Sequence, residues 1–264
     1  MKNEIISWIK KTVKEAGAEG IVVGLSGGID SAVVAHLATE ALGKDNVLGV
    51  WIAADSSREA SRNSLRVAHE LDIRQIRLNI SEEVNHLVDK TLTEYETDTP
   101  EHFERYISGE GVKKDIKFRE TDKFDLILGN LKARMRTSML YVVAQNNNYL
   151  VAGTGNKSEE YIGYFTKWGD GASDFNPILH LTKTEVYELA KSLNINERII
   201  KQAPSADLWD GQTDEDELGF TYETLDKYLS GEEIDSETKE KIENLHKKNL
   251  HKLNEVPNMK EKED

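Results

Sequence analysis

The sequence contains no cysteine among its 264 residues. Disulfide bonds, thiolate zinc sites and iron–sulfur clusters are therefore excluded, because each of them requires cysteine sulfur. A cysteine nucleophile, of the kind that many glutamine amidotransferases use, is excluded for the same reason. Long apolar runs are also lacking, since no stretch approaches the roughly 18 apolar residues of a membrane-spanning helix. The N-terminus carries an acid and lacks the pattern of a signal peptide. These absences predict a cytoplasmic protein with no membrane partner.

Positive charge is scarce in this chain. Lys and Arg number 34 against 48 Asp and Glu, which gives a net charge of −14. Binding along nucleic acid requires clustered Lys and Arg, so the sequence predicts no nucleic-acid partner. A small nucleotide in a locally basic pocket is compatible with this charge. The length suffices for a sizeable core, and neither a repeat nor a low-complexity linker divides the chain. We therefore expect one domain over residues 1–264.

Apolar runs alternate with segments of helical periodicity. Strands are expected at 21–25, 47–53, 73–80 and 149–152, and helices at 5–15, 30–42, 59–71, 81–92, 126–146 and 183–193. Such alternation predicts an α/β fold with a doubly wound parallel sheet and helices on both faces, a Rossmann-like arrangement. Residues 93–122 are polar and interrupted by proline and glycine, which is typical of a variable or mobile connection. The chain from Asp214 onward has an acidic, helical pattern.

The segment Ser26–Ser31, Ser-Gly-Gly-Ile-Asp-Ser, joins the first expected strand to the helix that follows. Gly27 and Gly28 have no Cβ, so their backbone can adopt positive φ and approach a ligand closely. The N-terminus of the following helix offers unpaired N–H groups to an anion. The carboxylate of Asp30 does not favour a phosphate and is better suited to hold a cation beside one. An ordinary glycine turn is the alternative interpretation.

Ligands of doubly wound sheets bind beyond the carboxyl ends of the strands. Three polar segments are expected to meet there, at residues 26–31, 53–57 and 153–160. Asp30 and Glu159 could therefore share one metal ion although they are far apart in the sequence. The alternative for Glu159 is an acid in the first turn of a helix, where the helix dipole stabilises it.

Two further stretches combine charge with aromatic or apolar side chains. Residues 164–177 contain aromatics flanked by a lysine and acids, a mixture more typical of a ligand-binding loop than of a core, although a structural loop remains the alternative. Residues 132–136 place Lys132, Arg134 and Arg136 on the long expected helix. Arg suits bidentate contact with carboxylate or phosphate. For Arg136 we expect a solvated helix face.

The Ser26–Ser31 pattern resembles the PP-loop of the ATP pyrophosphatases, which cleave ATP between its α and β phosphates. Further segments together resemble ammonia-dependent NAD synthetase over nearly the whole chain. They are G-N-L-K-A-R-M-R at 129–136, G-T-G-N-K-S-E at 153–159, F-T-K-W-G-D-G at 165–171, P-I-L-H-L-T-K at 177–183, P-S-A-D-L at 204–208, D-E-D-E-L-G at 214–219 and H-K at 251–252. The resemblance implies a fold of the adenine nucleotide alpha-hydrolase type.

The resemblance also implies a reaction. ATP adenylates the nicotinate carboxylate of deamido-NAD (nicotinic acid adenine dinucleotide) with release of pyrophosphate, and ammonia then displaces AMP to give NAD. Mg²⁺ is the implied cofactor, held by Asp30 and Glu159, and ATP is the co-substrate. The glutaminase domain of the family's second form is not expected in this chain, which implies free ammonia or a separate donor. A homodimer is implied as well.

Site residues carry over from the matching motifs. The resemblance implies ATP contacts from Gly24, Leu25, Ser26, Gly27, Gly28, Ile29, Asp30, Ser31, Thr154, Lys183 and Ser205. It implies deamido-NAD contacts from Arg134, Lys167, Asp174, His251 and Lys252. Asp30, Asp174 and Lys183 are the expected catalytic residues. We hypothesise that Asp174 accepts a proton from the incoming ammonium.

Three other interpretations are weighed against this one. Another PP-loop ligase, such as the ATP pyrophosphatase part of GMP synthetase, would share the Ser26–Ser31 loop but not the 165–171 run. A tRNA-thiolating enzyme fits poorly, because the chain has no cysteine to carry sulfur and no basic surface. A non-catalytic adenine-nucleotide sensor would have no need of Asp30, Glu159, Lys183 and Asp174 together. Pyrophosphate release that depends on deamido-NAD would separate an enzyme from a sensor.

Overall fold

The computed structural model describes residues 1–93, 124–205, 207 and 211–257. The polar connection expected at 93–122 lies outside the described residues except for its first position. The same holds for the end of the chain beyond residue 257. Among the helices that the structure describes, none combines the length and apolar character needed to cross a bilayer.

Four parallel strands form the sheet, in the order β3-β2-β1-β4. Their bounds are Gly20–Gly24 for β1, Val47–Ala53 for β2, Arg74–Asn79 for β3 and Tyr149–Ala152 for β4. In the register, Val23 lies opposite Gly49 of β2 on one side and Ala152 of β4 on the other. The strand order reverses between β1 and β4, which makes their carboxyl ends a topological switch point. The predicted parallel sheet is confirmed.

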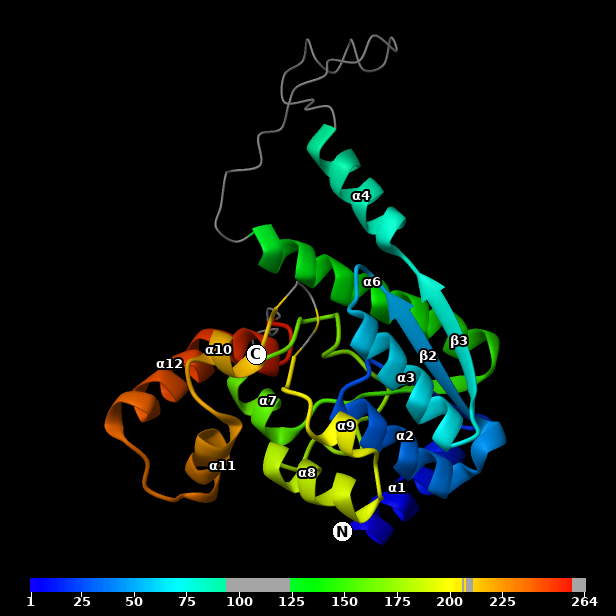
Figure 1. Ribbon diagram of the computed structural model, residues 1–264, viewed down its shortest axis with the longest axis horizontal. Helices are drawn as coiled ribbons and strands as arrows, with labels where there is room; N and C mark the ends of the chain where they lie inside the picture. Colours follow the sequence, from blue (N-terminus) through cyan, green and yellow to red (C-terminus); the bar gives the residue numbers. More distant parts are fainter. Residues whose placement is uncertain (94–123, 206, 208–210, 258–264) are drawn as a thin grey trace, which may run out of the picture.

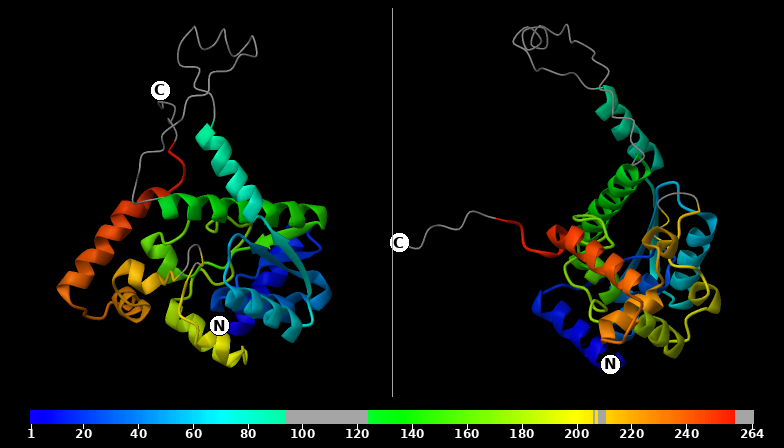
Figure 2. Two further views of the ribbon diagram at one scale, coloured as in Figure 1. Left: turned by 45° about the horizontal axis from the view of Figure 1, so that its top comes forward. Right: turned by 90° about the vertical axis from the view of Figure 1, so that its left-hand side faces the viewer.

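Helices occupy the ranges that the sequence predicts, with ends shifted by a few residues, and the structure adds two short helices at 157–162 and 197–200 that the sequence did not predict. The helices are α1 Lys2–Glu15, α2 Ile29–Leu42, α3 Arg58–Glu70, α4 Ser81–Thr93, α6 Phe124–Asn146, α7 Lys157–Ile162, α8 Lys183–Ser192, α9 Glu197–Ile200, α10 Asp214–Leu218, α11 Tyr222–Ser230 and α12 Ser236–Leu253. The acidic segment from Asp214 onward forms α10, α11 and α12, as expected. Figure 1 shows α11 and α12 at the end of the molecule opposite β3, and the left panel of Figure 2 shows the same separation.

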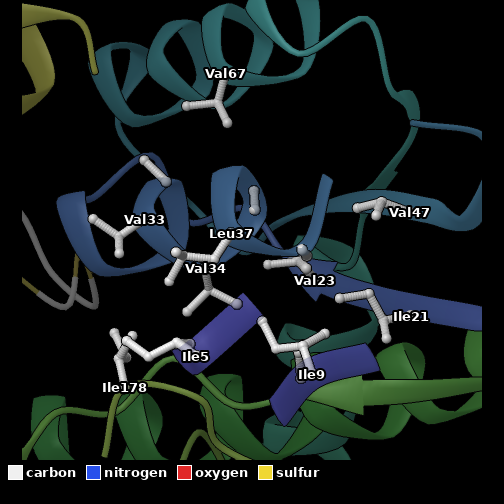
Figure 3. Close-up of a cluster of buried hydrophobic side chains, with 14 of the residues drawn as sticks. Ile5, Ile9, Ile21, Val23, Val33, Val34, Leu37, Val47, Val67 and Ile178 are labelled. Carbon is white, nitrogen blue, oxygen red and sulfur yellow. The ribbon is translucent and has the colours of Figure 1, made fainter. Parts of the chain in front are cut away.

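Helices cover both faces of the sheet because neighbouring strand residues point in opposite directions. Val23 of β1 faces the cluster built with α1, α2 and α8, whereas Val22 faces the cluster built with α6. Figure 3 shows the first cluster, with Ile9 of α1 on one side of α2 and Val67 of α3 on the other. Most of the circumference of α2 is buried between these neighbours, including Ala32, Val33, Val34, Leu37 and Ala38.

A third apolar cluster joins the C-terminal helices to α7. It contains Ile162, Phe220, Tyr222, Leu225 and Ile242, all buried. Burial of these side chains is the hydrophobic contribution that holds α11 and α12 against α7. α11 also contacts α8. The C-terminal helices therefore reach the two short helices, α7 and α8, that begin at the switch-point edge of the sheet.

Candidate active site

The loop after β1 is shaped by one glycine in particular. Gly27 has φ +91°, and a Cβ there would lie 2.3 Å from the carbonyl oxygen of Ala60. Both the backbone conformation and the space therefore require glycine. Gly28 has φ −88°, so of the two glycines Gly27 alone adopts the positive φ that the sequence allows for both.

Hydroxyl groups fold this loop onto the start of α2. The N–H of Gly28 donates to Ser26 Oγ at 3.2 Å, and Ser31 Oγ donates to the carbonyl oxygen of Gly28 at 3.0 Å. The two serine hydroxyls lie 3.1 Å apart. The loop that the sequence assigns to ATP thus presents serine hydroxyls and backbone N–H groups at a helix N-terminus, where an anion is stabilised.

Three charged side chains from distant parts of the chain meet beside this loop. The Nζ of Lys183 lies 2.7 Å from Oδ2 of Asp30 and 3.0 Å from Oε1 of Glu159. The Lys183 side chain is only 3% exposed, and the two carboxylates are 17% and 18% exposed. The prediction that Asp30 and Glu159 lie together is confirmed, and the structure adds that one ammonium group is bonded to both.

Burial and pairing act against each other in this cluster. Burial raises the pKa of Glu159 to about 7, although the nearby ammonium of Lys183 lowers it in part. Burial lowers the pKa of Lys183, but the carboxylates of Asp30 and Glu159 outweigh this effect and raise the pKa above its ordinary value. Lys183 therefore stays protonated, and it supplies the positive charge that the two buried carboxylates require.

Asn156 connects the two loops at the switch point and was missed by sequence reasoning. Its Nδ2 donates to Oδ1 of Asp30 at 2.9 Å, and its Oδ1 accepts from the N–H of Glu159 at 3.0 Å, capping α7. Its side chain is fully buried. The residue lies within the 153–159 motif, but its N-cap role could have been inferred only from the position before a helix.

Lys183 is placed by the start of α8. Thr182 and Glu185 form a capping box, with Thr182 Oγ1 accepting from the N–H of Glu185 at 3.3 Å and Glu185 Oε2 accepting from the N–H of Thr182 at 2.8 Å. α8 therefore begins at Lys183 itself, which fixes the direction in which the side chain leaves the helix.

A second group of predicted residues lies around residues 163–171. Arg134 Nε donates to the carbonyl oxygen of Lys167 at 3.3 Å, and Lys167 Nζ donates to the carbonyl oxygen of His251. Lys252 Nζ donates to the carbonyl oxygens of Gly163 at 2.8 Å and Phe165 at 2.7 Å. The loop at residues 163–171 thus connects Arg134 of α6 with His251 and Lys252 of α12, and Lys167 lies within this loop.

Asp174 lies apart from that group, beside β4. Its Oδ2 accepts from the N–H of Val151 at 2.7 Å, and its Oδ1 accepts from the hydroxyl of Tyr141 at 3.4 Å. Burial raises the pKa of Tyr141, and the charge of Asp174 raises it further. Sequence reasoning did not identify Tyr141, which is one of several apolar or aromatic residues on α6.

Ser205 and Thr154 complete the predicted ATP residues. Ser205 Oγ accepts from the N–H of Asp207 at 3.1 Å, and Asp207 Oδ2 accepts from the N–H of Ser57 at 2.9 Å. The segment of Ser205 is thereby held at the start of α3. Thr154 lies half-buried in the loop between β4 and α7.

The expectation that Arg136 lies on a solvated helix face is wrong. Instead of facing solvent, its Nε donates to the carbonyl oxygen of Ile52 at 3.1 Å and its terminal nitrogen donates to Ser56 Oγ at 3.0 Å. Lys132, one helical turn earlier, is buried and forms an ion pair with Asp55 at 3.2 Å. α6 runs behind the switch-point edge, so this face of the helix holds the loop after β2.

A cavity of about 290 Å³ opens beside that loop. It is lined by Trp51, by the serines Ser56, Ser57 and Ser61, and by Arg58 and Arg62. An aromatic ring together with hydroxyl and guanidinium donors is a lining that suits a polar organic ligand.

Comparison with known proteins gives matches along nearly the whole chain. The family model described as NAD synthase matches residues 1–257. An "NH(3)-dependent NAD(+) synthetase" of Mesoplasma florum is 42% identical over 250 residues, which cover 95% of this chain and 92% of the relative. The structure of NMN synthetase from Francisella tularensis is similar with a TM-score of 0.84 and 33% identity, covering 98% of this chain and 96% of the other. An NH3-dependent NAD synthetase from Campylobacter jejuni, solved with nitrate, gives a TM-score of 0.71 and 32% identity, covering 98% and 97%.

Proposed function

The chain belongs to the NAD synthase family, and we propose that it joins ammonia to the nicotinate carboxyl group of deamido-NAD at the carboxyl edge of its sheet. It is a ligase that forms a carbon–nitrogen bond with ATP as co-substrate. The observation that carries the proposal is the ammonium of Lys183, held by Asp30 and Glu159 beside the loop after β1.

The chemistry explains why ATP is required. A carboxylate is a poor electrophile, since its charge repels nucleophiles and it has no usable leaving group. In the first step a carboxylate oxygen attacks the α-phosphorus of ATP, the bond to the β-phosphate oxygen breaks, and pyrophosphate leaves. In the second step ammonia attacks the carbonyl carbon, AMP leaves with the bonding electrons, and the nitrogen loses a proton. The N–H groups and hydroxyls of residues 26–31 would stabilise the departing pyrophosphate.

The donor set fits Mg²⁺. Asp30 and Glu159 present oxygens that converge on one point, which the Lys183 ammonium marks. In the described part of the chain no three His, Cys, Asp or Glu side chains gather as a metal site. Mg²⁺ commonly takes one or two carboxylates and fills its remaining positions with phosphate oxygens and water. When bound, the ion would neutralise triphosphate charge and so reduce its repulsion of the carboxylate. Lys183 would then contact the phosphates.

The acceptor would lie against the second group of residues. Arg134, Lys167, His251 and Lys252 place positive charge and donors around residues 163–171, which suits a phosphate-bearing dinucleotide. Asp174 would accept the proton that the nitrogen releases, with one oxygen fixed by the backbone of β4. Ser205 and Thr154 would also contact ATP.

The direct test supplies ATP, Mg²⁺ and ammonium with and without deamido-NAD, and follows pyrophosphate together with NAD. We expect both products only when deamido-NAD is present. Lys183→Met should abolish both, whereas Lys191→Met, an exposed lysine of the same helix, should abolish neither. ATP binding with no pyrophosphate in any mixture would support a nucleotide sensor and overturn the proposal. Pyrophosphate without NAD would keep the ATP chemistry but reject the acceptor.

A second acceptor is favoured by one observation. The NMN synthetase structure has a TM-score of 0.84, against 0.71 for the NAD synthetase from Campylobacter jejuni. An acceptor ending at the first phosphate would present the same nicotinate carboxyl group without the AMP half. Parallel assays with deamido-NAD and nicotinic acid mononucleotide decide between them. We expect the larger kcat/KM with the dinucleotide, in keeping with the curated relatives.

We also propose a homodimer in the cytoplasm. The exposed apolar side chains of α6 support the dimer, since exposed apolar surface is a candidate for contact with a second copy of the chain. They are Phe124, Leu126, Ile127 and Val142, each between 42% and 59% exposed. Light scattering of the purified protein should give twice the monomer mass, and Val142→Glu should shift the mass toward the monomer. A wild-type protein that stays monomeric at micromolar concentration would reject the dimer.

A further inference from the structure

Asp226 is a buried acid that none of the sequence motifs singles out. It lies on α11 and is 8% exposed. Its carboxylate accepts three hydrogen bonds from two other helices: the hydroxyl of Ser158 donates to Oδ1, and the N–H and hydroxyl of Thr184 each donate to Oδ2 at 2.7 Å. Ser158 is fully buried and its Oγ accepts from the N–H of Lys183 at 2.9 Å.

The partners of Asp226 are the chain neighbours of two site residues. Ser158 directly precedes Glu159 on α7, and Thr184 directly follows Lys183 on α8. One carboxylate therefore binds both helices at the points from which the Glu159 and Lys183 side chains depart. The side chains of these two site residues also meet each other, since Lys183 Nζ and Glu159 Oε1 are 3.0 Å apart.

We propose that Asp226 is a positioning residue that sets the separation of Lys183 and Glu159, and this inference rests on the function proposed above. α7 has only six residues and α8 starts from a loop, so neither helix alone fixes the distance between the two side chains. A carboxylate at the N-terminus of α8 satisfies an otherwise unpaired backbone N–H and is stabilised by the helix dipole. Charge-assisted bonds of this kind hold geometry more tightly than neutral ones.

Through this contact the C-terminal helices help to position the Lys183 and Glu159 side chains. Leu225, next to Asp226, is fully buried in the cluster that holds α11 against α7. Packing of this cluster holds α11 in place. The hydrogen bonds of Asp226 then hold the starts of α7 and α8 relative to α11. A shift of about 1 Å in a reacting group can cost about 100-fold in rate, so even slight slackening here should be measurable.

The test compares Asp226→Ala and Asp226→Asn with Tyr228→Phe. Tyr228 lies on the same helix, and its hydroxyl is 3.3 Å from that of Tyr161 on α7, so the control removes a contact between α11 and α7 without touching α8. Each variant is assayed for kcat and for KM with ATP and deamido-NAD, for ATP affinity in the presence of Mg²⁺ by calorimetry, and for melting temperature.

We expect Asp226→Ala to lower kcat/KM for ATP by about 10-fold to 100-fold, with the KM for deamido-NAD nearly unchanged. Asp226→Asn should recover part of the loss, because its amide oxygen can still accept from Thr184. Tyr228→Phe should lower the melting temperature but leave kcat/KM for ATP close to that of the wild type. An equal loss in Asp226→Ala and Tyr228→Phe would show a merely structural role and overturn the inference.

Two further measurements decide the role of Asp226 if Asp226→Ala does not fold or if the wild type makes no NAD. If Asp226→Ala does not fold, Asp226→Asn carries the comparison with Tyr228→Phe. If the wild type makes no NAD, the proposed function fails, but ATP calorimetry still decides the role of Asp226. Weaker ATP binding in the Asp226 variants than in Tyr228→Phe supports the inference, and identical binding in all three overturns it.

Discussion

Lys183 Nζ donates to Asp30 Oδ2 at 2.7 Å, across 153 residues of sequence. The bond joins the first turn of α8 to the first turn of α2, and the same ammonium also reaches Glu159 at 3.0 Å. This ammonium is thus a cation that the two carboxylates share. The pair therefore holds together the part of the site where two loops of the sheet meet.

The first prediction concerns this ammonium. Lys183→Met should lower the free energy of unfolding by about 3 kcal/mol, because removal of one partner leaves buried carboxylates unpaired. Mg²⁺ should restore stability to the variant to a greater extent than to the wild type, because a divalent cation can take the place of the ammonium. Urea unfolding with and without Mg²⁺, at matched ionic strength, measures both effects. Adding Glu159→Gln should remove the Mg²⁺ effect; a gain from Mg²⁺ that survives it would contradict the prediction.

The second prediction separates the two loop glycines. Gly27→Ala should destabilise the protein by at least about 2 kcal/mol and abolish ATP binding, because a Cβ would meet the carbonyl oxygen of Ala60 and the backbone has positive φ. Gly28→Ala is the matched control, since its Cβ would lie 3.4 Å from Ser26 Oγ at an ordinary φ. Chemical unfolding and ATP calorimetry check both variants. Equal behaviour of the two would contradict this account of the loop.

The third prediction concerns proton removal by Asp174. Asp174→Asn should lower kcat by about 100-fold or more while ATP affinity is unchanged, because the amide can keep the bond from Val151 but cannot accept a proton. Single-turnover assays should show pyrophosphate release preserved and NAD formation slowed. Tyr141→Phe serves as the control, since it removes the other neighbour of Asp174 without removing the carboxylate. Unchanged NAD formation in Asp174→Asn would reject the role.

The fourth prediction is a pH dependence of stability. Nδ1 of His36 donates to the carbonyl oxygen of Ala32 at 2.8 Å, and burial lowers its pKa despite the opposing charges of Glu70 and Glu40. The unfolded state therefore binds a proton more readily than the folded state, so stability falls as the pH drops below about 6.5. His36→Asn cannot be protonated and should lose less stability between pH 7.5 and 5.5. Parallel slopes for the two proteins would contradict this.

Much of this architecture could be predicted from the sequence because the relevant signals are local. The strands at 47–53 and 149–152 follow directly from short apolar runs, and the capping box at Thr182 follows from a four-residue pattern. The convergence of Asp30 and Glu159 was predictable too, because parallel strands place their carboxyl ends at one edge.

Other features depend on which surfaces meet after folding. Arg136 on α6 has the sequence context of a solvated helix residue, yet it bonds the carbonyl oxygen of Ile52 because α6 packs behind the end of β2. Asn156 and Asp226 gain their roles from partners between 42 and 126 residues away in the sequence. No periodicity records such partners.

The sequence by itself determined the four strands and the longer helices in their order, the loop at residues 26–31 and the charged side chains brought to the sheet edge. Tertiary structure alone decided that Lys183 is bonded to both Asp30 and Glu159, and that Asp226 binds the helices behind them. The physical reason is range. Propensity, capping and hydrophobic periodicity act over a few residues, whereas burial and charge pairing depend on the packing of distant segments.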